Sequence, residues 1–374
     1  MTHIRTHIPK LFVLLSLLAL ITSGCSDDTV TQPEDPFDPP RFNWRSIEIP
    51  AGGIAGIWAA DTGKIFWINN NRKGVMSVQN DAFEIRYYGD YNANLIRGVS
   101  ESEIYVFGSN RASGEITIMK WNGSSFEYYP SGITSHNRTT IKGCLDLSGN
   151  VWIASETGAA RFDGVNVTSY SYDNPDLDLK DIYLSSENKV EIICAKGFSN
   201  ELARQCLYEF RDTGFVKVFD ESKVPMPLYT SLIEIGGFKS GVTSNFSTGT
   251  VCIEKFELPV FSRYFCFDPL IRNATISRNS GLVGTSPDNF LFVAEVTSAD
   301  IFTPPYRTGI VHWNGIKPSA ELGVVISMPG NEYDEFIVSQ IDEDKFIVME
   351  PFSTNNPQNA VLHIGTLKTN QAQR

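Results

Sequence analysis

Histidine is scarce in this chain, with 5 in 374 residues, and no HExxH, CxxC or other histidine and cysteine spacing typical of a metal site occurs. The GxSxG, P-loop and GxGxxG motifs are absent as well. No motif selects a nucleophile–histidine–carboxylate site assembled from distant segments. These absences argue against a zinc enzyme and favour a function without catalysis.

Positive charge is also in short supply. The chain has 31 Lys and Arg against 43 Asp and Glu, a formal net charge of −12. Removal of a leader that contains Arg5 and Lys10 changes the balance to 29 − 43 = −14. Such an excess of acid argues against nucleic acid, or a surface of anionic lipid, as the main partner. Hydrophobic residues make up 42% of the chain, which excludes general disorder and allows a sizeable core.

No apolar run beyond the N-terminal region reaches the length of about 18 residues that crosses a bilayer. The N-terminal region has Arg5 and Lys10 and then an apolar run at 11–21, which predicts a secretory signal of residues 1–24. The residues that follow the run, Thr22-Ser23-Gly24-Cys25, resemble the lipobox of bacterial lipoproteins. The resemblance implies that Cys25 carries palmitate and anchors the chain in the outer membrane, its only expected membrane contact. Ordinary cleavage that leaves a free thiol is the alternative.

Residues 25–40 are rich in proline and in acidic residues. Both oppose packing, so we expect an extended tether. The acids just after Cys25, Asp27 and Asp28, resemble the surface-export signal of Bacteroidetes-type lipoproteins. A solvated linker without such a signal is the alternative interpretation.

A unit of about 40 to 55 residues recurs along the rest of the chain. One element is a short apolar strand after a polar turn, as in KIFWIN at 64–69, NVWIAS at 150–155 and KFIVME at 345–350. The other is a strand that ends in an aromatic residue, a short turn and a further strand. The turns Asn122-Gly123, Asp163-Gly164 and Asn314-Gly315 are expected to supply the positive φ angles of two-residue hairpins.

Each unit is expected to fold as four antiparallel strands, and seven units fit, with second strands near residues 67, 106, 152, 192, 242, 292 and 348. The seventh unit ends at its third strand, whereas residues 44–49, from Trp44 to Ile49, have the pattern of a fourth strand without a partner. The sequence thus predicts an all-β, seven-bladed β-propeller of four-stranded antiparallel blades over residues 41–368. The N-terminal strand closes the last blade and a polar tail follows at 369–374. A parallel solenoid is the structural alternative.

The third unit, residues 147–164, resembles the two-component-regulator propeller repeat. It contains Gly149-Asn150-Val151-Trp152-Ile153, then Ser155-Glu156-Thr157-Gly158, then Phe162-Asp163-Gly164. In that family such propellers form the periplasmic sensor parts of hybrid histidine kinases. No kinase part is found in this sequence, so the resemblance implies an architecture and not phosphotransfer.

Four cysteines form two candidate disulfides, Cys194 with Cys206 in the fourth unit and Cys252 with Cys266 in the fifth. The expected compartment is oxidising, and each pair joins if the strand register places its members opposite each other. Closing a loop of about a dozen residues stabilises a fold by roughly 3 kcal/mol. Cys144 is expected to be a small buried hydrophobic residue.

In a propeller, the loops after the second and the fourth strands gather on one face, around the central channel, and that face usually carries binding. Aromatic side chains suited to stacking on a sugar or to anchoring a protein are predicted there, although packing that only braces the loops is the alternative. These residues are Phe198, Phe302, Tyr306, Phe352, Tyr91 and Tyr172. Glu156 and Glu350 end or follow second strands at the same face, and a pair of carboxylates there would suit glycoside cleavage.

Asp173, Asp176, Asp178 and Asp181 crowd the link between the third and fourth units. Carboxylate oxygens at this density are a candidate calcium site, although their spacing matches no known calcium loop. A solvated acidic loop is the alternative. No other cofactor is expected.

Together these features favour a non-catalytic lipoprotein of a Gram-negative cell envelope that binds a glycan or an envelope protein through the loop face of a β-propeller. Two alternatives stay open. One is a glycan lyase or hydrolase that uses acids of the central face, and the other is a structural subunit of an envelope complex.

Overall fold

The computed structural model describes residues 38–50, 53–79, 82–135, 141–172, 178–185, 187–196, 203–224, 229–235, 238–244, 251–257, 260–266, 271–272, 282–286, 289–296, 308–324, 337–350 and 359–368. The chain divides into two units, Met1–Pro36 and Phe37–Arg374, and the described residues all belong to the second. The expected signal sequence and Cys25 therefore lie outside the described residues. Within the described ranges no helix has the length and apolar character needed to span a membrane.

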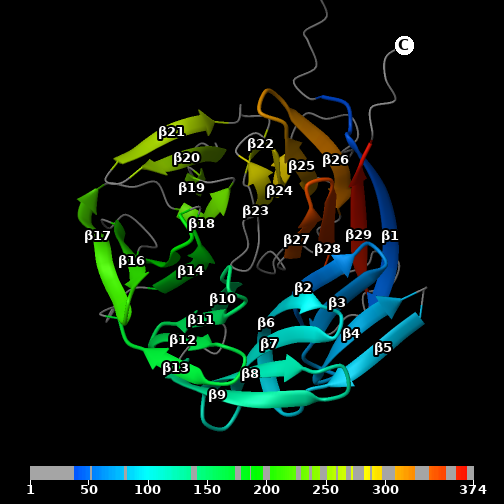
Figure 1. The fold of residues 1–374 in the computed structure, drawn as a ribbon. Helices are drawn as coiled ribbons and strands as arrows, with labels where there is room; N and C mark the ends of the chain where they lie inside the picture. Colours follow the sequence, from blue (N-terminus) through cyan, green and yellow to red (C-terminus); the bar gives the residue numbers. More distant parts are fainter. Residues whose placement is uncertain are drawn as a thin grey trace, which may run out of the picture. The chain divides into compact units, whose positions relative to one another are not determined.

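Every regular element of the described residues is a β-strand, and the strands form seven sheets, here called blades one to seven in chain order (Figure 1). Blade one contains β2 (Ile54–Asp61), β3 (Lys64–Asn69), β4 (Gly74–Gln79) and β5 (Ala82–Tyr87). Blade two contains β6 (Tyr91–Ser100), β7 (Glu103–Asn110), β8 (Glu115–Trp121) and β9 (Phe126–Thr134). Blade three contains β10 (Lys142–Leu145), β11 (Val151–Ser155), β12 (Gly158–Phe162) and β13 (Val167–Tyr170).

Blades four, five and seven have four strands as predicted, whereas blade six has five. Blade four contains β14 (Asp178–Leu184), β15 (Val190–Lys196), β16 (Ala203–Arg211) and β17 (Gly214–Val224). Blade five contains β18 (Tyr229–Ile235), β19 (Phe238–Ser244), β20 (Val251–Glu257) and β21 (Val260–Cys266). Blade six contains β22 (Ile271–Arg272), β23 (Leu282–Ser286), β24 (Asn289–Val296), β25 (Thr308–Trp313) and β26 (Pro318–Val324), because both β22 and β23 pair with β24. Blade seven contains β27 (Ile337–Asp342), β28 (Lys345–Glu350), β29 (Asn359–Leu367) and, from the start of the chain, β1 (Phe42–Pro50).

The blades form a closed ring because their innermost strands contact one another in cyclic order. Contacts join β2 to β6, β6 to β10, β10 to β14, β14 to β18, β18 to β23, β23 to β27, and β27 back to β2. Figure 1 shows the sheets radiating from a common centre. The β-propeller predicted from the repeats is confirmed, and the expected second strands are β3, β7, β11, β15, β19, β24 and β28.

The core lies between neighbouring blades, because a blade has two apolar faces and cannot cover either alone. Between blades seven and one, Met349 and Leu362 pack with Ile57 and Trp67 in one buried cluster. Further clusters fill the seams between blades one and two, two and three, three and four, and six and seven. Each large side chain that is fully buried in such a seam contributes roughly 1.5–3 kcal/mol.

The turn before β11 shows why the motif of the third unit folds as it does. Asp146 accepts hydrogen bonds from the backbone N–H groups of Ser148 and Asn150, both at 2.9 Å. Its second carboxylate oxygen accepts from the Asn150 amide at 2.8 Å and from the Trp152 indole Nε1 at 2.9 Å. Gly149 completes the turn with a φ of 78°. These bonds lower the pKa of Asp146 against the opposing effect of burial, which is the largest single influence on it.

The Asn-Gly and Asp-Gly hairpins differ from the prediction. They are four-residue connections, in which Asp163 N donates to Asn166 O and Asn122 N donates to Ser125 O. Only the glycine adopts a positive φ, 96° at Gly164. The Asp163 carboxylate instead accepts from the backbone N–H groups of the residues two and three positions later. An Asx turn of this kind, and not a two-residue type I′ turn, explains the residue preference.

The N-terminal strand closes the ring, as the sequence predicted. β1 pairs antiparallel with β29 over its full length, from Phe42 opposite Leu367 to Pro50 opposite Asn359. Trp44 lies opposite Gly365 and covers it so closely that a Cβ at that position would approach the indole ring to 2.7 Å. Only glycine leaves room for the ring, so Gly365 and Trp44 together fix the register.

A carboxylate from blade six holds the start of β1. Glu321 is buried and accepts from the backbone N–H of Arg41 at 2.9 Å and from that of Phe42 at 3.0 Å. Asp38 bonds the same blade, since its N–H donates to Pro318 O at 2.9 Å and its side chain accepts from Asn314 Nδ2 at 2.6 Å. The segment before β1 is therefore bonded to blade six, and β1 itself pairs with blade seven. Both blades hold the closing strand.

A buried histidine packs at the same seam. His312 is 1% exposed, its Nε2 lies 2.8 Å from Asn289 Oδ1, and its ring meets Phe42 edge-on at 5.1 Å. Its Nδ1 has no hydrogen-bond partner among the described residues. Burial, assisted by the nearby Arg41 charge, lowers the pKa of His312 to about 4. Protonation of this side chain therefore opposes closure.

Replacing Glu321 with glutamine is expected to lower the free energy of unfolding by roughly 1–3 kcal/mol, because the backbone N–H groups lose charge-assisted bonds. Urea denaturation of the full chain measures the change. The matched control is Glu84→Gln, whose side chain is 62% exposed on β5 and whose loss is expected to cost about 0.5 kcal/mol or less. Equal effects of the two variants would show that the buried carboxylate does not hold the ring.

Acidification is expected to weaken the fold through His312, whose pKa falls from 6.5 to about 4 on folding. As the pH falls from about 6.5 to about 4, the unfolded chain binds the proton first, so stability that is full above pH 6.5 declines by roughly 2–3 kcal/mol. His312→Gln keeps a donor for Asn289 and is expected to reduce that dependence. Urea midpoints at pH 7, 5.5 and 4.5 compare the two proteins, and parallel profiles would contradict the assignment.

Candidate ligand-binding face

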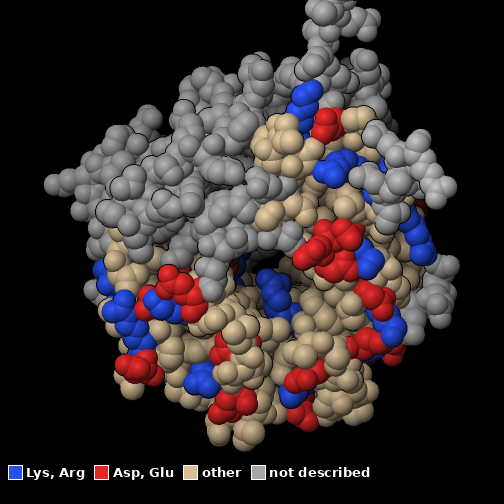
Figure 2. Space-filling view, turned by 45° about the horizontal axis from the view of Figure 1, so that its top comes forward, with Lys and Arg blue, Asp and Glu red and all other residues tan. Residues whose placement is uncertain are grey.

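One end of the ring gathers the connections that follow the second and fourth strands of each blade. Among the described residues these are the turns at 70–73, 88–90, 111–114 and 156–157. The opposite end carries the short turns between first and second strands and the hairpins. Figure 2 shows a hollow at the centre of the ring with Lys or Arg side chains inside it and acidic side chains on the surrounding surface.

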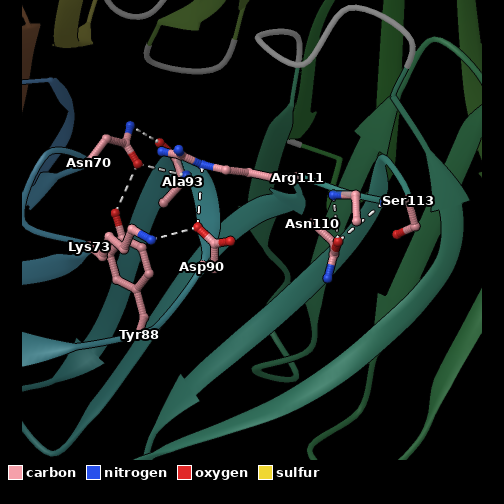
Figure 3. A network of polar contacts seen from close by, with 9 residues as sticks. Asn70, Lys73, Tyr88, Asp90, Ala93, Asn110, Arg111 and Ser113 are labelled. Carbon is pink, nitrogen blue, oxygen red and sulfur yellow. Dashed lines mark hydrogen bonds and ion pairs between the residues drawn. The ribbon is translucent and has the colours of Figure 1, made fainter.

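A polar network joins three of these turns at the seam of blades one and two (Figure 3). Asn70, in the turn after β3, accepts from Tyr88 Oη at 2.9 Å and from the Ala93 N–H at 2.9 Å, and its Nδ2 donates to Ala93 O at 2.8 Å. Asn70 thus joins the turn after β3 to Tyr88, which follows β5, and to β6 of blade two. Burial raises the pKa of Tyr88, so its hydroxyl stays a hydrogen-bond donor.

Charged side chains stand at the exposed edge of this network. Lys73 Nζ lies 2.7 Å from Asp90 Oδ1, and Arg111 Nε lies 3.7 Å from the same oxygen. The hydrogen bond from Lys73 lowers the pKa of Asp90. The Asp90 side chain is 68% exposed and those of Lys73 and Arg111 are each 46% exposed, so all three remain available to a ligand.

Two tyrosines stack beside this edge. Tyr91 and Tyr128 have ring centroids 5.6 Å apart with an interplanar angle of 18°, and Tyr128 Oη donates to Tyr88 O at 3.1 Å. Tyr128 is 45% exposed. Of the aromatic residues predicted to bind, Tyr91 is therefore placed next to exposed polar groups. We call Lys73, Asp90, Tyr91, Arg111 and Tyr128 the tyrosine patch.

Tyr172 was expected on the binding face, but that prediction is wrong. The ring is 9% exposed and packs against Tyr208 and Phe215 at the seam of blades three and four. Its hydroxyl donates to Ser155 O, and burial raises its pKa. A tyrosine in a connecting loop can satisfy its hydroxyl on a backbone carbonyl, and here the apolar ring then fills the core.

The two glutamates predicted as an acid pair belong to different blades. Glu156 follows β11 and accepts from Ser135 Oγ at 3.2 Å. Glu350 ends β28, is 5% exposed, and lies 3.0 Å from His363 Nε2 on β29. Glu350 therefore points along its own blade, toward an outer strand.

Charge also lines the innermost strands of blades two to four. Arg97 on β6, Lys142 on β10 and Asp181 on β14 interact electrostatically, and Cys144 lies among them. Burial raises the pKa values of Asp181 and Cys144, so the thiol stays protonated. Cys144 also packs against the apolar cluster between blades three and four, where it is partly buried and not, as predicted, fully buried.

Several predicted residues lie outside the described part of the chain, namely Phe198, Phe302, Tyr306, Phe352, Asp173 and Asp176. Asp178 begins β14, but its side chain is not among those described. No cluster of three or more metal-ligating side chains occurs within the described residues, so the calcium site stays a prediction.

The strand register brings both cysteine pairs into direct opposition. Cys194 on β15 lies opposite Cys206 on β16, and Cys252 on β20 lies opposite Cys266 on β21. Cys194 and Cys206 are buried thiols in this structure. The register requirement stated for a disulfide is met, and both disulfides stay predictions for the oxidised protein.

Sequence reasoning missed most of the tyrosine patch. The run YYGDY at 87–91 offered a signal, because it places three tyrosines and an acid around a glycine in one connection. Gly89 adopts a φ of 86°, which turns the chain between β5 and β6. Lys73 and Arg111 come from turns of two other strand pairs, and no local pattern joins them to it.

The fold has known relatives in structure. Streptogramin B lyase superposes with a TM-score of 0.57 at 12% identity, covering 88% of this chain and 98% of that one. A catalytically inactive virginiamycin B lyase from Staphylococcus aureus with quinupristin gives 0.54 at 11% identity, covering 87% and 100%. A gluconolactonase from Xanthomonas campestris gives 0.41 at 10% identity, covering 88% and 95%.

At this level of identity the likeness extends to the β-propeller fold alone. Neither the scan of protein-family models nor the search of curated proteins gives a match.

Proposed function

We propose that this protein is a lipid-anchored β-propeller of the outer membrane that binds a glycan at the tyrosine patch. The observation that carries the proposal is the stacked Tyr91–Tyr128 pair beside the Lys73–Asp90–Arg111 ion pairs. Aromatic rings cover the apolar C–H face of a sugar, while charged and amide groups bond its hydroxyls.

The patch is also preorganised. Asn70 bonds the β6 backbone at Ala93 and accepts from the Tyr88 hydroxyl, and these bonds fix the connection that holds Asp90 and Tyr91. Asp90 bridges two cations, so its carboxylate is oriented before a ligand arrives. A site that needs little reordering loses less entropy on binding.

Binding fits the described acids better than glycoside cleavage does. A cleaving pair of carboxylates stands about 5–10 Å apart across one sugar. Glu156 accepts a hydrogen bond from Ser135, and Glu350 bonds His363 of blade seven. Each carboxylate is therefore engaged by a different neighbour on a different blade. An envelope protein as partner of the same face remains the alternative occupant.

Glycan-array binding of the full chain in detergent tests the proposal. At least one glycan is expected to bind, and Tyr128→Ala and Asp90→Asn are expected to weaken its Kd roughly 5- to 20-fold, about 1–2 kcal/mol. Phe83→Ala is the matched control, because Phe83 is also 45% exposed but lies near the opposite end of blade one. Absence of any bound glycan, or equal losses in all three variants, would overturn the assignment.

The membrane anchor has its own test. Cells fed a palmitate analogue are expected to label the wild-type protein and not the Cys25→Ala variant, and the variant is expected to leave the membrane fraction. The Cys144→Ala variant serves as control, since that thiol lies within the propeller, partly buried, and is expected to carry no lipid. Label that persists in Cys25→Ala would remove the anchor and leave the binding proposal standing.

A further inference from the structure

Blade seven contains a chain of hydrogen bonds that runs across three neighbouring strands. Ser46 Oγ on β1 lies 2.9 Å from His363 Nδ1 on β29. His363 Nε2 lies 3.0 Å from Glu350 Oε2 on β28. A hydroxyl, an imidazole and a carboxylate therefore follow one another in the order of a nucleophile, a base and an orienting acid.

The carboxylate decides which nitrogen of the imidazole carries the proton. An ionised carboxylate only accepts hydrogen bonds, so His363 presents Nε2–H to Glu350. In the neutral ring the lone pair then lies on Nδ1, which faces the Ser46 hydroxyl. His363 is thus set to accept the serine proton, with its two nitrogens used in the reverse of the familiar serine-hydrolase order.

The imidazole and the carboxylate are buried, whereas the serine is exposed, as a nucleophile that must meet a substrate requires. The side chains of His363 and Glu350 are 7% and 6% exposed, whereas Ser46 is exposed on the outermost strand of the blade. The base and the acid are shielded from water, which strengthens their electrostatic interaction. The hydroxyl remains open to a substrate from solvent.

The sheet holds these groups in place. Ser46 lies opposite His363 in the pairing of β1 with β29, and Val348 lies opposite His363 in the pairing of β28 with β29. Val348 and Phe42, on the same face of the blade, pack against Leu291 of blade six. Sites supported by paired strands keep their geometry better than sites on loops.

We propose that Ser46, His363 and Glu350 form an acyl-transfer site that hydrolyses small carboxylic esters. Ser46 Oγ attacks the ester carbonyl carbon while its proton moves to His363 Nδ1, and Glu350 stabilises the imidazolium. The C–O bond to the alcohol breaks, the alcohol takes that proton, and an acyl-Ser46 ester remains. Water then adds to this ester, gives its proton to Nδ1, and the acid leaves as Ser46 Oγ regains the proton.

The test uses the full chain in detergent with a fluorophosphonate probe and p-nitrophenyl acetate. Mass spectrometry is expected to find the probe on Ser46, and Ser46→Ala is expected to abolish both labelling and ester hydrolysis above background. His363→Gln is expected to slow labelling at least about 100-fold. Ser148→Ala, an exposed serine in the turn before β11, is the matched control and is expected to leave both signals unchanged.

Two results would overturn the proposal: a probe that does not modify Ser46, or hydrolysis by Ser46→Ala at the wild-type rate. Because Ser46 is exposed, its alanine variant is expected to fold even where a change at buried His363 is not tolerated. Glu350→Gln is expected to slow labelling of Ser46 by the probe. The urea midpoint of Ser46→Ala is expected to equal that of the wild type, which shows that its loss of labelling does not come from unfolding. Glycan binding at the tyrosine patch is unaffected by either outcome, since no residue is shared.

Discussion

The structure depends on one constraint: a four-stranded blade has two apolar faces, and only another blade can cover each of them. An open row of blades would leave two such faces in water. The chain meets the constraint by returning β1 to blade seven, where Trp44 covers Gly365 and Ile49 joins the cluster shared with blade one. Every seam between blades, and every site built on a seam, presupposes this closure.

Closure by the first strand also explains why its beginning is held so firmly. A β1 bonded only to β29 would be an edge strand that frays from its free end. The Glu321 carboxylate and the Asp38 bonds attach that end to blade six instead.

Much of the fold was readable from the sequence because the repeats express local chemistry. The apolar pattern of the strand KIFWIN, the turn around Asp146 and the hairpin at Gly164 can each be recognised locally, and they recur at the spacing of the blades. The prediction failed in detail where one residue type serves two structures. Asp-Gly fits both a two-residue turn and an Asx turn, and only the pairing of Phe162 with Val167 distinguishes them.

The candidate site was less predictable, because its members come from separate blades. Lys73, Asp90 and Arg111 meet only when blades one and two pack, and no periodicity in the chain encodes that meeting. Burial is equally non-local: Tyr172, in the connection after β13, fills the core, whereas Tyr91, at the start of β6, stacks beside exposed charges. The exposed fraction of a loop aromatic depends on the volume left between two blades, which the sequence does not display.

The seam between blades six and seven combines buried histidines with buried carboxylates. It contains both described histidines, His312 and His363, and two buried glutamates, Glu321 and Glu350. Burying such groups costs free energy unless each is bonded, and an apolar pair would pack the seam more simply. Glu321 has a structural explanation in the hold on β1. The Glu350–His363 pair links β28 to β29, and the second imidazole nitrogen of His363 faces an exposed hydroxyl, which is the arrangement that chemistry at Ser46 requires.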